Sequence, residues 1–185
     1  MILANLIDEA FDKNGDQTKI LAIACGHLRE IDFCQSIKNV RPHTFIELDQ
    51  DEQSLSDVSR KTSQYAIKVA QGSVRDLLVG KIKVDPMDLI YNADLYDYLN
   101  NDIGSRLVTL MFSRFKSGGK LMISSFLTNT PEIGYVEPDM GLCMIYRDEK
   151  QMLDLTRGIS PDEILSIEQF REPDESITFL EVIRK

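Results

Sequence analysis

Hydrophobic positions along the chain alternate between short continuous runs and wider-spaced stripes. Short apolar runs bounded by turn residues are typical of buried parallel strands, whereas stripes spaced by three or four residues are typical of helices. The runs predict strands at residues 19–24, 44–48, 66–69, 87–92, 120–126, 164–170 and 177–183. The stripes predict helices at residues 2–11, 28–41, 51–65, 102–115 and 148–156.

The order of these elements predicts the fold class. Strands that alternate with helices require a parallel sheet with right-handed crossovers, so we expect an α/β, doubly wound sheet with helices on both faces. The last two strands are joined by only a few residues, which allows only an antiparallel pair. No linker or repeat interrupts the pattern, and we expect one domain over residues 1–185, with residues 1–17 as an N-terminal helix and turn. Because the first strand starts so early, one alternative is a fragment of a longer protein that lacks an N-terminal acceptor lid.

Composition narrows the class of protein. The apolar fraction is 43%, and no 18-residue uncharged apolar run is present, which predicts a soluble chain without a membrane span. The net charge of −9 disfavours nucleic acid and anionic membrane surfaces as partners. Three cysteines and two histidines, without C-x-x-C spacing, predict neither a metal site nor a disulfide framework, and a cytoplasmic location is the default expectation.

The first strand and the turn after it carry the clearest candidate chemistry. KILAIA runs directly into Cys25 and Gly26, and the second strand ends at Asp49, 23 residues after Gly26. A carboxylate at that offset is typical of a residue that binds ribose hydroxyls. A dinucleotide loop has three glycines, whereas only Gly26 is present here, which favours a ligand without phosphate at this point.

Ligands of such sheets bind at the carboxyl ends of the strands, so the segments after the other strands are further candidates. Small residues at Ala24, Cys25 and Gly26 leave the backbone open to a ligand. Further cofactor contacts are predicted for Gln50 beside Asp49, for the Ser73 hydroxyl and the Val74 amide at an adenine edge, and for Asn92 and Ala93.

Five segments in this order resemble the class I S-adenosylmethionine-dependent methyltransferases: LAIACG, IELDQ, QGSVRDL, MDLIYNADLYDYL and FKSGGKLMISSF. The resemblance covers most of the chain, although Ala24 and Leu28 stand where the family has glycines. It implies a Rossmann-like sheet of seven strands in the order 3-2-1-4-5-7-6, with strand 7 antiparallel. It also implies S-adenosyl-L-methionine as methyl donor, S-adenosyl-L-homocysteine as product, and these cofactor-binding residues: Ala24, Cys25, Gly26, Arg29, Asp49, Gln50, Ser73, Val74, Asn92 and Ala93.

A narrower resemblance concerns the methyl acceptor. ACGHLRE, NADLYDYL and GYVEPDMGLCMIYR are similar to segments of bacterial methyltransferases that form hydroxy-fatty-acid methyl esters, although Pro138 stands where those proteins often have Trp. This implies a small-molecule acceptor, such as the carboxylate of a hydroxy fatty acid.

Tyr96 and Arg147 are the predicted catalytic residues. An ionised carboxylate acceptor needs no general base, and Arg147 would orient it through a bidentate pair. A hydroxyl or amine acceptor needs a base, for which Asp97, Tyr96 and His27 are candidates. Glu137 and Arg147 flank an expected apolar wall of Met140, Cys143, Met144 and Ile145.

Two other function classes stay open. A non-catalytic domain that binds S-adenosylmethionine or a protein partner is compatible with the depleted glycine loop. An NAD-dependent dehydrogenase is the weaker alternative, because the chain has a single loop glycine and no well-placed catalytic histidine.

Overall fold

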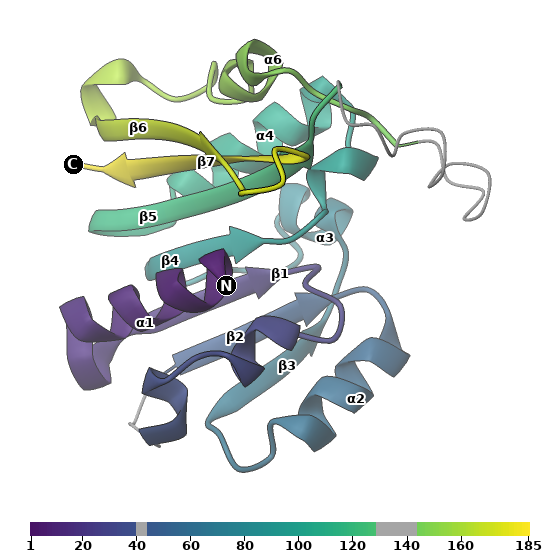
Figure 1. Ribbon diagram of the computed structural model, residues 1–185, viewed down its shortest axis with the longest axis vertical. Coiled ribbons are helices and arrows are strands. Elements are labelled where there is room, and N and C mark those ends of the chain that lie inside the picture. Colours follow the sequence, from purple (N-terminus) through teal and green to yellow (C-terminus); the bar gives the residue numbers. More distant parts are fainter. Residues whose placement is uncertain (40–43, 129–143) are drawn as a thin grey trace.

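The computed structural model describes residues 1–39, 44–128 and 144–185, and these form one seven-stranded sheet (Figure 1). The strand order is β3-β2-β1-β4-β5-β7-β6, and β7 runs antiparallel to both of its neighbours. This confirms the α/β class, the predicted order and the antiparallel seventh strand. The strands are β1 (Lys19–Ile23), β2 (Thr44–Asp49), β3 (Ile67–Gln71), β4 (Met87–Asn92), β5 (Phe115–Phe126), β6 (Ile164–Arg171) and β7 (Ile177–Arg184).

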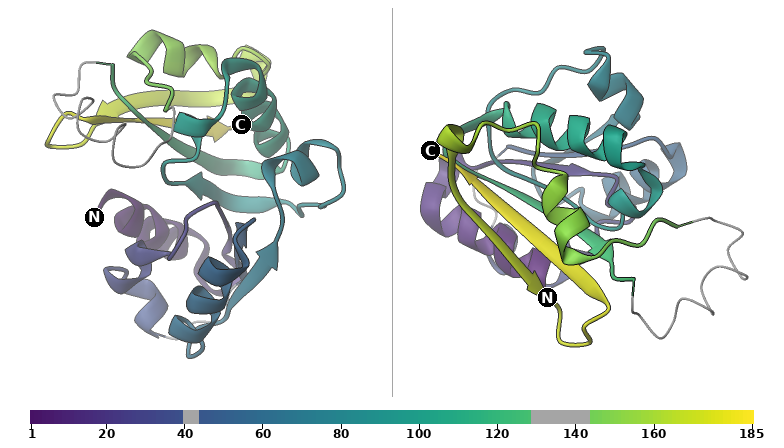
Figure 2. Two further views of the ribbon diagram at one scale, coloured as in Figure 1. Left: turned by 90° about the vertical axis from the view of Figure 1, so that its right-hand side faces the viewer. Right: turned by 90° about the horizontal axis from the view of Figure 1, so that it is seen from above.

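Helices cover both faces of the sheet, and α1 and α4 lie on opposite sides of it (Figure 2). The helices are α1 (Ile2–Asn14), α2 (Glu52–Lys61), α3 (Val74–Leu78), α4 (Asn101–Phe112) and α6 (Glu149–Asp154). Side chains of α1 and α2, such as Phe11 and Val58, pack in one hydrophobic cluster. Side chains of α3, α4 and α6, such as Leu77, Val108 and Met152, pack in the other. The sheet is therefore buried from both sides, as its apolar strands require.

The helix predicted at residues 28–41 does not form in the described part of that segment. Two short 3-10 turns, Arg29–Asp32 and Ser36–Asn39, take its place. Ile31, Cys34 and Ile37 are buried at a spacing of three, the period of a 3-10 helix, whereas Phe33, assigned to the apolar stripe, is 56% exposed. The prediction was wrong because it read a three-residue period as a helical one.

The region between α4 and β5 also differs from the prediction. α4 ends at Phe112, and β5 begins at Phe115 rather than at residue 120. The pairing with β4 jumps from Met87–Phe115 to Leu89–Lys120, so extra residues of β5 bulge out of the ladder. Gly118 has a φ of 76° within this bulge, a conformation that glycine adopts without strain.

A short helix after β3 was not predicted. Ser73 caps α3 in a capping box: its hydroxyl accepts the Asp76 amide, and the Asp76 carboxylate accepts the Ser73 amide. The sequence S-x-x-D carries this signal, but the helix has only five residues and no hydrophobic stripe long enough to show a period.

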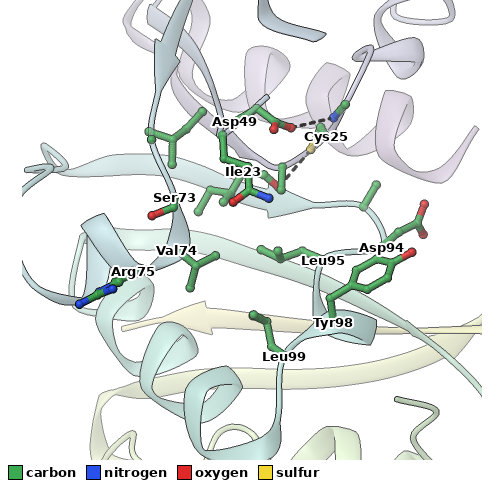
Figure 3. Close-up of a pocket in the computed structure, with 16 residues that line it drawn as sticks. Ile23, Cys25, Asp49, Ser73, Val74, Arg75, Asp94, Leu95, Tyr98 and Leu99 are labelled. Carbon is green, nitrogen blue, oxygen red and sulfur yellow. Dashed lines mark hydrogen bonds between the residues drawn. The ribbon is translucent and has the colours of Figure 1, made fainter. Parts of the chain in front are cut away.

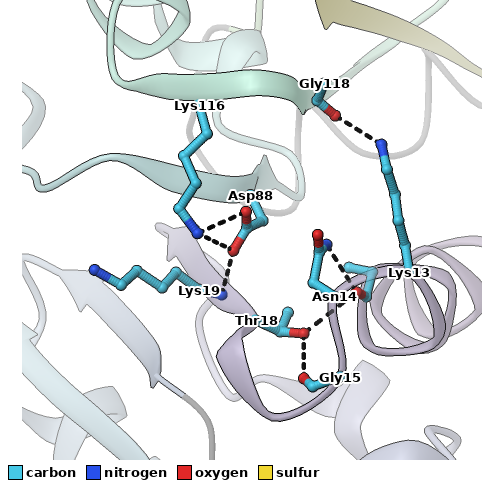
Figure 4. Close-up of polar contacts among 9 residues, drawn as sticks. Lys13, Asn14, Gly15, Thr18, Lys19, Asp88, Lys116 and Gly118 are labelled. Atoms are coloured by element: carbon cyan, nitrogen blue, oxygen red, sulfur yellow. Dashed lines mark hydrogen bonds and ion pairs between the residues drawn. The ribbon is translucent and has the colours of Figure 1, made fainter.

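Asp88 connects three elements at the amino ends of β1 and β4 (Figure 4). Its carboxylate accepts the Lys19 amide at 2.8 Å and the Lys116 ammonium at 2.8 Å. Lys13, at the end of α1, donates to the Gly118 carbonyl at 3.0 Å. These contacts fix α1 and β5 to the edge of the sheet opposite the strand ends where ligands of such folds bind.

We expect Asp88→Ala to lower the free energy of unfolding by about 1–3 kcal/mol, because it leaves the Lys19 amide and the Lys116 ammonium without their acceptor. Urea unfolding measures the loss, with the exposed neighbour Asp85→Ala as the matched control. Equal unfolding midpoints for the two variants would show that the Asp88 contacts contribute nothing.

Candidate functional site

A cavity of about 550 Å³ opens at the carboxyl ends of β1, β2 and β4 and at the start of α3 (Figure 3). That volume lies within the range of roughly 300–1,000 Å³ that is typical of small-molecule sites. The cavity brings together eight of the ten predicted cofactor residues: Ala24, Cys25, Gly26, Asp49, Gln50, Ser73, Val74 and Ala93.

The loop after β1 has an unusual backbone. Ala24, Gly26 and Leu28 have φ values of 53°, 55° and 49°, so every second residue adopts the left-handed conformation. This conformation is unstrained in glycine and costs roughly 1–2 kcal/mol in other residues. The loop therefore has the backbone that an alternating-glycine sequence adopts freely, although two of the three glycines are replaced.

Two contacts hold this strained loop in place. The Ala24 amide donates to the Leu48 carbonyl at 2.7 Å, which extends the pairing of β1 with β2 beyond the last strand residue. The Leu28 side chain is fully buried in the same hydrophobic cluster as α1. Burial of a leucine contributes about 1.5–3 kcal/mol, enough to offset the cost of its own left-handed conformation.

Asp49 connects the loop to the end of β2. Its carboxylate accepts the Gly26 amide at 3.4 Å and the Asp51 amide at 2.9 Å, and only 9% of the residue is exposed. A carboxylate has about four acceptor positions, so these two bonds leave positions for the hydroxyls of a sugar. The predicted ribose-binding residue is thus fixed in place by the loop it faces.

The Ser73 and Val74 end of the cavity differs in one respect from the prediction. The Ser73 hydroxyl donates to the Asp76 carboxylate at 2.7 Å as part of the helix cap, so it is already engaged. Val74 is the first residue of α3, and its amide has no acceptor within the helix. Of the two adenine contacts proposed from the sequence, the Val74 amide is the one this geometry favours.

Two predicted cofactor residues lie outside the cavity lining. Arg29 is exposed on the first 3-10 turn. Asn92 is 2% exposed at the end of β4, where its Oδ1 is buried without a hydrogen bond from the described residues. The cavity lining therefore includes Ala93, which follows Asn92, but neither Arg29 nor Asn92.

The end of the cavity after β4 belongs to a segment that the sequence indicated as a candidate, but its residues were given no cofactor or catalytic role. Asp94, Leu95, Tyr98 and Leu99 line it. The position of Asp94 after a buried strand was a usable signal, because side chains at strand ends point toward the ligand edge of the sheet.

The two predicted catalytic residues lie in the interior rather than in the cavity. Tyr96 is 1% exposed and packs in the core with Leu155 and Gly104. Arg147 is also 1% exposed, and its guanidinium donates to the Tyr96 and Leu99 carbonyls and to the Asn101 side chain. Arg147 thus holds the segment between β4 and α4, and this geometry does not support the predicted acceptor contacts of Tyr96 and Arg147.

Asp97 and His27, the other candidate bases, are also placed away from the cavity lining. Asp97 is fully buried and accepts the Ser125 hydroxyl at 2.7 Å and the Phe126 amide at 3.0 Å. Desolvation raises the pKa of Asp97 to about 6. The His27 side chain is 56% exposed and lies 3.7 Å from Asp57. Glu137, Met140 and Cys143 lie outside the described residues.

A buried polar cluster lies beneath the loop. The Tyr91 hydroxyl donates to Glu30 at 2.6 Å, and Glu47 is fully buried without a hydrogen bond from the described residues to either carboxylate oxygen. Desolvation, together with the charges of Glu30 and Asp49, raises the pKa of Glu47 to about 8. Desolvation also raises the pKa of the Cys25 thiol well above its usual range, so Cys25 is not an activated nucleophile.

The described residues offer neither a metal site nor a membrane-spanning helix. Residues 1–39, 44–128 and 144–185 contain no group of three His, Cys, Asp or Glu side chains arranged to hold a metal ion. Within the same ranges, no helix has the length and hydropathy needed to cross a bilayer. The cytoplasmic location stays a prediction.

The chain is similar to known proteins in structure rather than in sequence. No family model and no curated protein sequence matches the chain. A possible exported protein from Bordetella parapertussis superposes with a TM-score of 0.72 at 13% identity, covering 99% of this chain and 67% of that one. The N-methyltransferase NodS from Bradyrhizobium japonicum, in complex with S-adenosyl-L-homocysteine, gives 0.66 at 16% identity, covering 97% of this chain and 84% of that one.

A third structure, magnesium protoporphyrin IX methyltransferase from Synechocystis with bound S-adenosyl-L-homocysteine, gives a TM-score of 0.66 at 11% identity, covering 100% of this chain and 83% of that one. The chain has the fold of S-adenosylmethionine-dependent methyltransferases. At these identities the likeness establishes the fold alone.

We expect Arg147→Leu to destabilise the protein by about 3–5 kcal/mol, because it leaves the buried carbonyls of Tyr96 and Leu99 without a donor. Urea unfolding tests this, with the exposed Arg106→Leu as the control. If Arg147→Leu instead unfolds like the wild-type protein and loses only activity, Arg147 acts on the acceptor after all.

Glu47 predicts a pH dependence of stability. An ordinary glutamate has a pKa of about 4.3, so between that pH and 8 the folded protein binds more protons at Glu47 than the unfolded chain does. The free energy of unfolding therefore falls as pH rises through this window, by up to about 1.4 kcal/mol per pH unit. Glu47→Gln removes this contribution and stabilises the protein at pH 8.

Urea unfolding between pH 5 and pH 8.5 measures the slope, with the exposed Glu52→Gln as the control. A slope that is the same in Glu47→Gln and in the wild-type protein contradicts the assignment.

Proposed function

We propose that this protein is an S-adenosylmethionine-dependent methyltransferase that acts on a small molecule. The observation that carries the proposal is the cavity in which the left-handed loop, Asp49 and the start of α3 meet on a methyltransferase fold. Strained backbone persists where the surrounding structure enforces it, and such strain clusters at functional sites. The Ala24 and Leu28 conformations fit that pattern.

The residues of the cavity fit the methyl donor. Asp49 would hold the ribose hydroxyls, and its bond to the Gly26 amide keeps the carboxylate facing the loop. Val74 would offer its amide to the adenine edge, with Leu48 and Leu99 among the apolar groups of the same cavity. Ala24 and Gly26 leave room for the donor against the backbone, and no phosphate site is needed. When bound, the donor supplies a methyl group on a positively charged sulfur.

Transfer of that methyl group requires mainly proximity and alignment, and the cavity has room for both partners. Among the described residues, Val74 lines one end of the cavity, and Asp94 and Tyr98 line the other (Figure 3). We assign the first end to the donor's adenine and the second to the acceptor.

The carboxylate acceptor suggested by the narrower sequence resemblance, such as a hydroxy fatty acid, is not favoured by this arrangement. Such an acceptor needs a cation to orient it, and the candidate cation Arg147 is buried on backbone carbonyls. Asp94 stands at the acceptor end instead, where it would repel a second carboxylate.

The proposal predicts binding of S-adenosyl-L-homocysteine in calorimetric titration. Asp49→Ala weakens that binding by tenfold or more, since a hydrogen bond to a charged group contributes about 1.5–3 kcal/mol. The exposed Asp162→Ala is the control, and the unfolding midpoint of each variant shows whether it is folded.

Absence of binding at millimolar concentration contradicts the proposal. Binding without methyl transfer to amines, alcohols or carboxylic acids would favour the non-catalytic domain instead.

A further inference from the structure

Asp94 lies at the acceptor end of the cavity, and its backbone is held in place by the neighbouring strands. It lies two residues after the end of β4 and adopts a left-handed conformation with a φ of 57°, which aspartate tolerates better than most residues. The Ser124 hydroxyl of β5 accepts its amide at 3.4 Å. β4 and β5 therefore fix the position of the Asp94 backbone. Figure 3 shows the Asp94 side chain beside Tyr98 at the rim of the cavity.

The Asp94 carboxylate has no partner among the described residues, neither a hydrogen-bond donor nor a cation. Desolvation raises its pKa, with no opposing effect from a described charge. Asp94 is exposed, so its carboxylate is open to a ligand that enters the cavity from solvent. The Tyr98 ring, 46% exposed, lines the same end of the cavity.

The charges around this end have the same sign. Desolvation, followed by the charges of Asp174 and Asp94, raises the pKa of Glu172 in the turn between β6 and β7. Desolvation and then the charges of Asp97 and Asp94 raise the pKa of Tyr98. The acceptor end is therefore an electronegative region of a protein whose net charge is already −9.

The nearby arginines do not neutralise this region in the described structure. Arg147 is engaged with carbonyls, and Arg171 pairs with Glu149 at 2.9 Å and with Glu175 at 3.6 Å. Arg75 lines the cavity at the opposite end from Asp94 (Figure 3).

We propose that the methyl acceptor is an amine that binds as an ammonium ion, held by the Asp94 carboxylate and the face of the Tyr98 ring. The proposal rests on the methyltransferase function above and specifies its acceptor. A carboxylate beside an aromatic ring is a suitable pair for an organic ammonium, because the ring face also attracts a cation. A carboxylic acid would meet only negative charge here.

The Asp94 carboxylate also accepts the proton that the ammonium must lose before methyl transfer. The bound ammonium gives one proton to Asp94, which becomes a carboxylic acid, and the nitrogen regains its lone pair. That lone pair forms the bond to the methyl carbon as the carbon–sulfur bond breaks, and the electron pair of the broken bond stays on sulfur as a thioether. The nitrogen keeps the positive charge as a methylammonium, and Asp94 then releases its proton to water.

The test compares two small ligands of similar shape and opposite charge, n-butylamine and butyrate, against the protein saturated with S-adenosyl-L-homocysteine. We expect ligand-observed NMR to detect binding of n-butylammonium but not of butyrate. Asp94→Asn should weaken n-butylammonium binding at least tenfold, and Tyr98→Leu about threefold, while Tyr98→Phe retains it. The exposed Asp12→Asn is the matched control.

The affinity for S-adenosyl-L-homocysteine should stay within twofold of the wild-type value in all these variants, which separates this proposal from the previous one. If the wild-type protein does not bind S-adenosyl-L-homocysteine, the proposed function itself fails. If it does, the amine proposal is overturned by butyrate binding as tightly as n-butylammonium, by binding of neither ligand, or by an Asp94→Asn variant that binds n-butylammonium unchanged.

Discussion

The site depends on the backbone conformation of one loop. Three alternate residues, Ala24, Gly26 and Leu28, adopt left-handed conformations, and only the second is a glycine. The hydrogen bond from the Ala24 amide to the Leu48 carbonyl and the burial of Leu28 hold this conformation against its intrinsic cost, and the Gly26 amide connects it to Asp49. The cavity wall and the orientation of Asp49 both follow from it.

Below this loop lie two desolvated carboxyl groups, those of Glu30 and Glu47, which lower the stability of the core. Glu47 points into the same side of the sheet as Tyr91 and lies near Glu30, and burial raises the pKa of both carboxyl groups. Glu30 is satisfied by the Tyr91 hydroxyl, whereas neither Glu47 oxygen has a hydrogen-bond partner in the described structure. Groups of this kind lower stability, and they lie directly against the segment that forms the cavity.

The sequence was sufficient for the fold and for much of the cavity lining. Continuous apolar runs gave the strands, and short connections gave the antiparallel pair, because both depend on local pattern. Eight residues of the cavity lining between Ala24 and Ala93 could be predicted, because the ends of parallel strands meet at one edge of the sheet. The side-chain directions in the turn after β4 could not be predicted. A 3-10 helix at Tyr96–Tyr98 turns Tyr96 into the core and leaves Tyr98 at the cavity. The burial of Arg147 could not be predicted either, because two of its acceptors are backbone carbonyls that no sequence pattern identifies.

The central claim is that the loop and Asp49 form the binding site of a methyl donor. A crystal structure of the protein soaked with S-adenosyl-L-homocysteine tests it most directly. We expect density in the cavity, with the ribose hydroxyls on the Asp49 carboxylate, the adenine beside the Val74 amide and the sulfur toward Asp94 and Tyr98. Density at another site, or a cavity that stays empty at saturating ligand, would contradict it.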